Sequence, residues 1–205
     1  MVKKPVYIAV IAVATVVMIG GAVLLVAKFG RGSAGSANTG IQLVKDGKAL
    51  ATVVVDRSQK EKSGIDDAAA AKVLVDWIKK ITDVSLPIAE AAPQKGSVIF
   101  VGAAAVKAGL KLDDIQSPSK EGVRILTDGN RILIGGQNPT ATVKAACRFL
   151  EEFGCRYFME GPMGEVYPRQ TTLSVGNLSI TEQPGFLQRS MWGFTATPIG
   201  GAGTS

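Results

Sequence analysis

The sequence predicts an α/β (α+β) fold: one mixed β-sheet with two main helices packed largely on one face, preceded by an N-terminal transmembrane helix. Three observations support this prediction. Two amphipathic segments carry capping residues at their ends, and two pairs of strands are joined by Asp-Gly turns at residues 46–47 and 128–129. Between them, the continuous apolar run Val98–Val101 is typical of a central strand that is covered on both faces.

Residues 1–31 are expected to form a membrane anchor or an uncleaved signal. Val6–Ala27 is apolar and carries no charge, and its length as a helix is roughly 33 Å, which matches the hydrocarbon core of a bilayer. The alternative is a signal peptide that is cleaved near Ala37, among small residues. Both interpretations place the rest of the chain outside the cytoplasm, either membrane-anchored in the periplasm or at the cell surface, or secreted.

The remainder divides into three parts. Residues 32–40 are rich in Gly, Ser and Ala and are expected to be a flexible linker. Residues 41–183 are expected to form the α/β domain. Residues 184–205 would be the start of a following domain or a disordered tail, because the segment 184–194 is apolar and has no obvious partner in this chain.

The first half of the domain predicts a hairpin of strands 41–44 and 49–55, followed by a charged loop. A helix is expected at Asp66–Thr82, with Asp66 or Asp67 as its cap. The residues expected on its buried face are Val73, Leu74, Trp77, Ile78 and Ile81. The next segment contains Pro87, which limits it to an edge strand, and a short helix is expected at 104–108.

The second half predicts a hairpin of strands 122–127 and 131–134 and then a second long helix. Asn138 suits the cap of that helix, Pro139 its first position, and Gly154 the position just past its end. The residues expected on its core face are Val143, Ala146, Cys147, Leu150 and Phe153. Short strands are expected in 155–161, 171–175 and 178–181, with Cys155 and Tyr157 on one face of the first and Arg156 and Phe158 on the other.

Charge and composition exclude several classes of function. Four of the 23 basic residues and none of the 17 acidic ones lie in residues 1–31, so the rest of the chain has a net charge of only +2. This is not the charge of a nucleic-acid-binding protein, and no nucleic-acid partner is expected. The chain has no histidine and two cysteines, which excludes a histidine-dependent catalytic triad and a zinc site with histidine or four thiolate ligands.

Several patterns that could mark a site are better explained by architecture. The glycines in "IFVGAAAVKAG" and "ILIGGQNPTATVKAA" join a strand to a helix, but neither segment has a complete phosphate-binding pattern, so ordinary turns are expected. Adjacent carboxylates point in different directions on a helix, so the pairs at 66–67, 113–114 and 151–152 do not supply the two facing carboxylates of a glycosidase. Cys147 and Cys155 are expected to be packing residues, with a disulfide left open. We therefore predict no catalytic, cofactor-binding or metal-binding residue in this chain.

The order of short motifs in the second half resembles a known domain. These motifs are Glu121-Gly122, Ile132–Gly136, Phe149–Glu151, Gly154–Tyr157, Gly164–Pro168 and Pro184-Gly185-Phe186 with Arg189. Together they resemble the non-catalytic N-terminal domain that precedes a TIM barrel in α-glucuronidases and related glycoside hydrolases of families 20 and 67. The resemblance covers residues 41–191, and it departs from the family pattern in the helix segment "VKAACRF".

The resemblance implies an accessory domain of an exported enzyme that degrades polysaccharides. In that family the catalytic carboxylates belong to the barrel, and this chain contains only a segment resembling the first barrel strand, so no catalytic residue carries over. The expected partners are the membrane, a C-terminal catalytic barrel and a polysaccharide. The alternative is a surface-tethered carbohydrate-binding or structural module, for which the candidate aromatic platforms are Trp77, Tyr157, Tyr167 and Trp192. A third hypothesis is a complete small enzyme.

Overall fold

The computed structural model describes residues 40–57, 64–159 and 161–185. They belong to one compact unit, Gly40–Ser205. Within these ranges no helix has both the length and the apolar character needed to cross a bilayer. The predicted anchor Val6–Ala27, the cleavage site near Ala37 and Trp192 lie outside the described residues.

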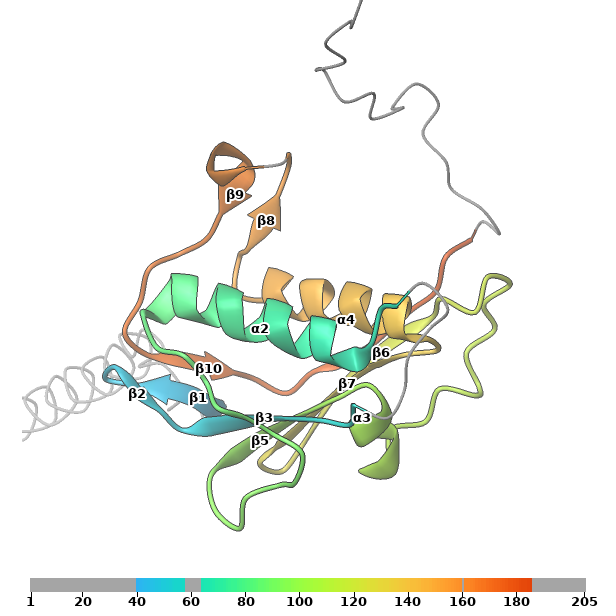
Figure 1. The fold of residues 1–205 in the computed structure, drawn as a ribbon, viewed down its shortest axis with the longest axis horizontal. Coiled ribbons are helices and arrows are strands. Elements are labelled where there is room, and N and C mark those ends of the chain that lie inside the picture. Colours follow the sequence, from blue (N-terminus) through green and yellow to red (C-terminus); the bar gives the residue numbers. More distant parts are fainter. Residues whose placement is uncertain (1–39, 58–63, 160, 186–205) are drawn as a thin grey trace, which may run out of the picture. The chain divides into compact units, whose positions relative to one another are not determined.

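The described chain forms a mixed α/β structure (Figure 1). Its elements are β1 (Ile41–Lys45), β2 (Lys48–Ala49), β3 (Ala51–Val55), α2 (Asp67–Thr82), β4 (Ile88–Ala89), β5 (Ser97–Val101), α3 (Ala103–Lys107), β6 (Val123–Asp128), β7 (Arg131–Gly136), α4 (Pro139–Glu151), β8 (Arg156–Tyr157), a 3₁₀ turn (Pro162–Gly164), β9 (Glu165–Val166), β10 (Leu173–Val175) and β11 (Ser179–Glu182). The main sheet has the order β11-β6-β7-β5-β3-β4. The helices α2 and α4 lie side by side on one face of this sheet, and α3 lies on the other, which confirms the mixed α/β part of the predicted fold class.

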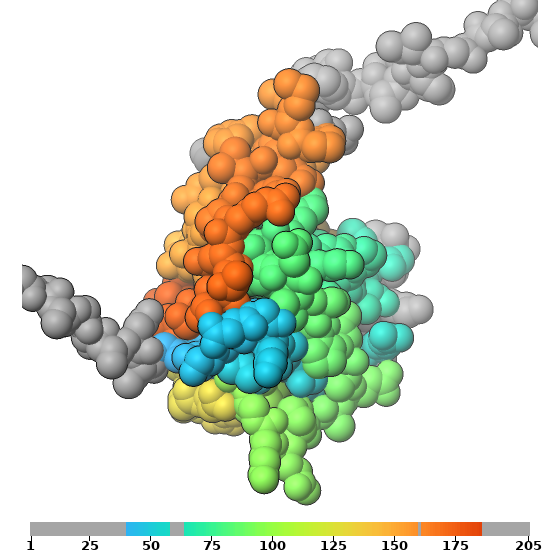
Figure 2. Space-filling model, turned by 90° about the vertical axis from the view of Figure 1, so that its left-hand side faces the viewer, coloured from blue at the N-terminus to red at the C-terminus, as the bar shows by residue number. Residues whose placement is uncertain are grey.

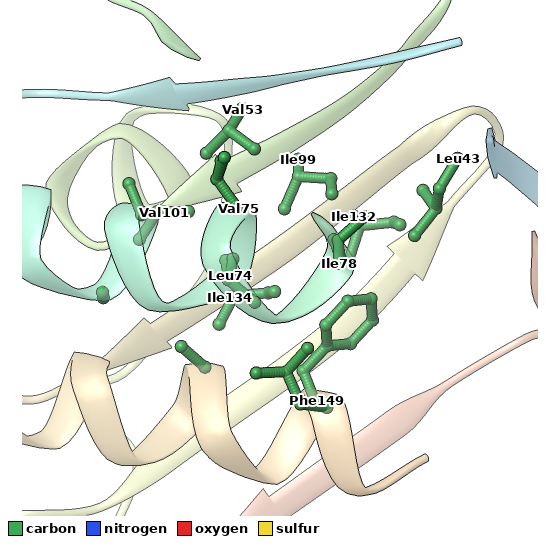
Figure 3. Close-up of a cluster of buried hydrophobic side chains, with 14 of the residues drawn as sticks. Leu43, Val53, Leu74, Val75, Ile78, Ile99, Val101, Ile132, Ile134 and Phe149 are labelled. Carbon is green, nitrogen blue, oxygen red and sulfur yellow. The ribbon is translucent and has the colours of Figure 1, made fainter. Parts of the chain in front are cut away.

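The central position of β5 follows from its sequence. It pairs in parallel with β3 on one side and with β7 on the other. Alternate side chains leave opposite faces of a strand, so Ile99 and Val101 enter the core beneath α2 and α4, while Val98 packs with Val54 and Ala104 on the opposite face. Figure 3 shows the larger core, in which strand residues such as Ile99, Ile132 and Ile134 meet Leu74, Ile78 and Phe149 of the two helices.

The predicted strand 49–55 is two strands, which corrects the expected hairpin. β2 pairs with β1, whereas β3 joins the main sheet beside β5. The change occurs at Leu50, whose N–H donates to the carbonyl of Leu43 and whose carbonyl accepts from Ser97. The local sequence gives no signal of this division, because β2 pairs with its sequence neighbour β1, whereas β3 is stabilised by β5, which is distant in the sequence. β1 also pairs with β10, and this gives a second, three-stranded sheet.

Helix α2 begins and ends as the sequence predicts. The Asp66 side chain accepts a hydrogen bond from the N–H of Ala69, and the helix stops at Asp83, whose backbone is left-handed. Leu74, Ile78 and Ile81 are buried as expected. The other two predicted positions, Val73 and Trp77, are only half-buried, while Ala70, Ala71 and Val75 are buried instead. The buried face is displaced because α2 packs against both the sheet and α4.

Helix α4 also has the predicted start, with Asn138 accepting from Ala141 and Pro139 at the first position. Its predicted core face is wrong at Cys147, which is exposed, and it omits Phe149, which is fully buried. Cys147 and Phe149 are two positions apart, so their side chains point to nearly opposite sides of the helix and only one of them can face the core. The structure buries the side that contains phenylalanine because the larger side chain removes more apolar surface from water.

The matched pair Phe149 and Phe158 tests this core. We expect Phe149→Ala to lower the free energy of unfolding by about 3–5 kcal/mol, because its ring is fully buried and makes an edge-to-face contact with Phe153. Phe158→Ala, at an exposed ring, should cost less than about 0.5 kcal/mol. Urea unfolding followed by far-UV circular dichroism measures both. Equal losses in the two variants would contradict the assignment of the core.

Candidate functional site

The carboxyl ends of β5 and β7 border a cavity of about 610 Å³, where α3 and α4 begin. In open α/β sheets, ligands are commonly bound at this edge. The lining includes Asp67, Lys107 and Lys120 together with the starts of both helices. This edge is therefore the first place to look for a site.

The N-terminus of α3 is occupied by a side chain of the protein itself. Asp67 is buried, with 3% of its surface exposed, and its Oδ2 accepts a hydrogen bond of 2.7 Å from the N–H of Ala103. A Cβ atom at Gly102 would lie 2.0 Å from the Asp67 carboxyl carbon, so glycine is required for this close approach. The carboxylate takes the place that a bound phosphate would need, and its negative charge opposes an anionic ligand there.

The second strand-to-helix connection is closed in a similar way. Asn138 caps α4, and the Thr142 hydroxyl accepts from the N–H of Gly136. A Cβ atom at Gly136 would lie 2.3 Å from the backbone of Ala141, so strand and helix are in direct contact. Gly102 and Gly136 thus serve close packing.

The sequence predicts Asp67 only as an alternative cap for α2 and gives no indication of its contact with α3. Asp66 provides that cap, while Asp67 binds a backbone N–H that lies 36 positions away in the sequence. Burial raises the pKa of Asp67; the hydrogen bonds from Ala103 and Thr142 oppose this shift, and the charges of Asp66 and Asp56 add to it. Local spacing carries no signal for such a contact.

The remaining carboxylate pairs are not arranged as a catalytic pair. Asp114 forms a two-pronged ion pair with Arg124, and Glu152 pairs with Arg148 on the surface of α4. Within the residues that the structure describes, no cluster of three or more acidic or cysteine side chains could hold a metal ion.

The two cysteines are free, and of the two only Cys155 packs in the core. Cys155 is buried, and burial raises its pKa to about 11, so it is a neutral thiol at pH 7. Cys147 lies at the surface of α4, where desolvation of its sulfur and the charge of Glu151 raise its pKa. A raised pKa reduces the thiolate fraction and hence the nucleophilic reactivity of both residues.

The most unusual surface is the β8–β9 ribbon, which we define as residues 156–159 and 161–166. β8 and β9 pair only with each other, and the ribbon projects beyond the helix layer (Figures 1 and 2). It exposes Tyr157 (58%), Phe158 (73%), Met159 (62%), Met163 (95%) and Val166 (50%). The predicted alternation, with one of the pairs Cys155/Tyr157 and Arg156/Phe158 facing the core, is wrong: Cys155 is buried, but Arg156, Tyr157 and Phe158 are all exposed.

Three of the four candidate aromatic platforms lie near this ribbon. Trp77 and Tyr167 are in edge-to-face contact, with ring centres 6.0 Å apart. The ammonium group of Lys80 lies 4.8 Å from the centre of the Trp77 ring and forms an ion pair with Glu165 of the ribbon at 2.6 Å. Tyr157 and Trp77 line the same hollow between α2, α4 and β8. The ribbon is thus attached to the outer side of the helix layer.

Comparison with known proteins gave structural matches only. No protein-family model and no curated protein sequence matches the chain. Among solved structures, a family GH115 4-O-methyl-α-glucuronidase with specificity for decorated arabinogalactans matches at 12% identity and a TM-score of 0.46, over 63% of this chain and 17% of that one. Two structures of Streptomyces plicatus β-hexosaminidase, one a mutant with its product GlcNAc and one with thio-NAglucal, match at 16% identity and TM-scores of 0.41 and 0.40.

Each hexosaminidase match covers 73% of this chain and 24% of the other. The chain therefore spans about a quarter or less of the length of these enzymes. The matched structures are glycoside hydrolases, and no single family is confirmed.

The buried carboxyl of Asp67 predicts a pH-dependent stability. Its folded-state pKa is raised, so between 3.8, its ordinary value, and that higher value the folded protein binds more protons than the unfolded chain. The contribution of Asp67 to stability is therefore full below 3.8 and is lost as the pH rises through the folded-state pKa. Asp67→Asn, which can still accept from Ala103, should abolish this part of the pH dependence.

Urea unfolding of both proteins from pH 4 to pH 7 measures this effect. The stability of the wild type relative to Asp67→Asn should fall as the pH rises. Asp113→Asn is the control, because Asp113 lines the same cavity but is exposed. A constant difference between wild type and Asp67→Asn across the range would show that the Asp67 pKa is not raised.

Proposed function

We propose that residues 41–183 form a non-catalytic accessory domain of an exported carbohydrate-active enzyme of the glycoside hydrolase class. The order of motifs from Glu121-Gly122 to Pro184-Gly185-Phe186 supports this proposal, because it resembles the domain that precedes the barrel in such enzymes. In this proposal Val6–Ala27 anchors the chain in the membrane and the domain lies outside the cytoplasm. The barrel that follows would carry the catalytic carboxylates.

The observation that carries the proposal is the apolar surface of the β8–β9 ribbon. Five large apolar side chains are at least half exposed within eleven consecutive sequence positions, 156–166. Contiguous exposed apolar surface on a soluble domain usually marks a contact with a partner. A following domain is a suitable partner because it is tethered to this one, so association costs little translational entropy.

The closed strand ends agree with an accessory role. The crevice where an α/β domain commonly binds its ligand contains an internal carboxylate, and its helix starts already have hydrogen-bond partners. Among the described residues, Asp114 and Glu152 form surface ion pairs, Asp66 caps α2, and Asp67 accepts from the N–H of Ala103. These four carboxylates therefore have structural roles.

The test uses the open reading frame downstream of Ser205 and the longer protein that it encodes. We expect an in-frame barrel domain and a protein in which Met163→Ser with Val166→Ser lowers the melting temperature or separates one calorimetric transition into two. The reason is that the two polar side chains would disrupt the apolar contact between the domains.

Val106→Ser on α3 is the matched control, since Val106 and Val166 have similar exposure, 48% and 50%. This variant should leave the transition unchanged. Equal effects of the control and the ribbon variant would exclude the ribbon as the interface. Turnover of aryl glucuronides or hexosaminides by the 205-residue chain alone would overturn the accessory role.

A further inference from the structure

A second hollow, of about 440 Å³, lies at the base of the β8–β9 ribbon. Its walls come from three elements that are distant in the sequence: Val73 and Trp77 from α2, Cys147 and Leu150 from α4, and Arg156 and Tyr157 from β8. Its size is within the range of small-ligand sites in proteins, which are concave, mainly apolar and provided with a few polar groups. The side chains of α2 and α4 alone do not form this hollow, because Arg156 and Tyr157 of the ribbon supply one of its walls.

Two aromatic rings line this hollow from different sides of the fold. Trp77 is held in place by its edge-to-face contact with Tyr167 and by Lys80 beside its ring. Tyr157 is more than half exposed. Rigid aromatic side chains offer flat apolar surface with little loss of side-chain entropy on binding.

Polar groups lie beside the two aromatic rings in the lining of the hollow. The Arg156 guanidinium is fixed by Nη1, which donates to the carbonyl oxygens of Glu151 at 3.1 Å and Cys155 at 2.6 Å. Within the described part of the chain, its Nε and Nη2 groups donate to no other atom, so they are available to a ligand. Glu151 and Glu165 add carboxylate oxygens to the same lining.

We propose that this hollow binds a pyranose unit of a polysaccharide. A pyranose has an apolar C–H face that can lie on an aromatic ring and an edge of hydroxyl groups that can bond to Arg156, Glu151 and Glu165. An apolar protein segment fits less well, because it would remove water from these charged groups without replacing their hydrogen bonds. The proposal goes beyond the accessory role, since it gives the domain a ligand of its own.

The experiment uses the full 205-residue chain in a detergent without a sugar head group, so that the detergent does not compete. Xylotetraose, cellotetraose, chitotetraose and tetragalacturonic acid are titrated by isothermal calorimetry. We expect at least one of them to bind, and Tyr157→Ala to weaken this binding roughly fivefold or more. Phe158→Ala, which changes the next residue of the ribbon but not the lining, should stay within about twofold of the wild type.

Arg156→Lys separates hydrogen bonding from charge. Lysine keeps the positive charge but not the planar arrangement of donors, so the variant should weaken the binding of a neutral tetrasaccharide. If the Arg156→Lys variant still binds tetragalacturonic acid but none of the neutral tetrasaccharides, the recognised group is the carboxylate of the saccharide. Trp77→Phe should reduce affinity while circular dichroism remains unchanged, and if that variant unfolds, Tyr157→Ala decides by itself.

The proposal is overturned if none of the four saccharides binds at about 10 mM, or if Tyr157→Ala binds as tightly as the wild type. The proposal is also overturned if an apolar peptide saturates the hollow and displaces no saccharide, because the saccharide would then not be bound in the hollow. These outcomes leave the accessory role intact, because that role is tested by the unfolding of the longer protein and not by saccharide binding.

Discussion

Burial of both faces of β5 is the constraint on which the rest of the structure depends. A strand covered on both sides needs a layer of helices above and below it, and its parallel neighbours β3 and β7 can be reached only through crossover connections. The crossover from β3 to β5 contains α2 and the crossover from β5 to β7 contains α3, and these two helices lie on opposite faces of the sheet; α4 follows β7 and packs beside α2. Because the strands are parallel, these connections also bring the starts of the helices to one edge of the sheet.

Open α/β folds commonly bind their ligands at that edge of the sheet, whereas in this protein the edge is used for packing. Asp67, at the start of α2, binds the first N–H of α3, and the absence of a side chain at Gly102 permits the approach. A buried carboxylate at this point costs desolvation energy, which the hydrogen bonds offset in part. The outcome is a crevice in which the helix starts already have hydrogen-bond partners, whereas the large exposed apolar side chains gather on the β8–β9 ribbon beside the outer side of α2 and α4.

The ribbon and the hollow at its base combine two kinds of surface. The tip is apolar and exposed, which suits contact with another domain, whereas the base joins aromatic rings to charged hydrogen-bonding groups. Ligand sites are frequent next to domain interfaces, because two elements that meet there form a concave surface. The ion pair between Lys80 and Glu165 links both regions, since it holds the ribbon against α2 beside Trp77.

The sequence by itself determined the element types, the caps of α2 and α4, the central place of β5 and the absence of histidine chemistry, because these depend on local periodicity, capping and composition. Only the tertiary structure decided the division of strand 49–55, the burial of Phe149 in place of Cys147, the contact of Asp67 with Ala103 and the meeting of Trp77 with Tyr157 around one hollow. Each of these depends on a partner that lies far away in the sequence, and a pairing of that kind leaves no local pattern to detect.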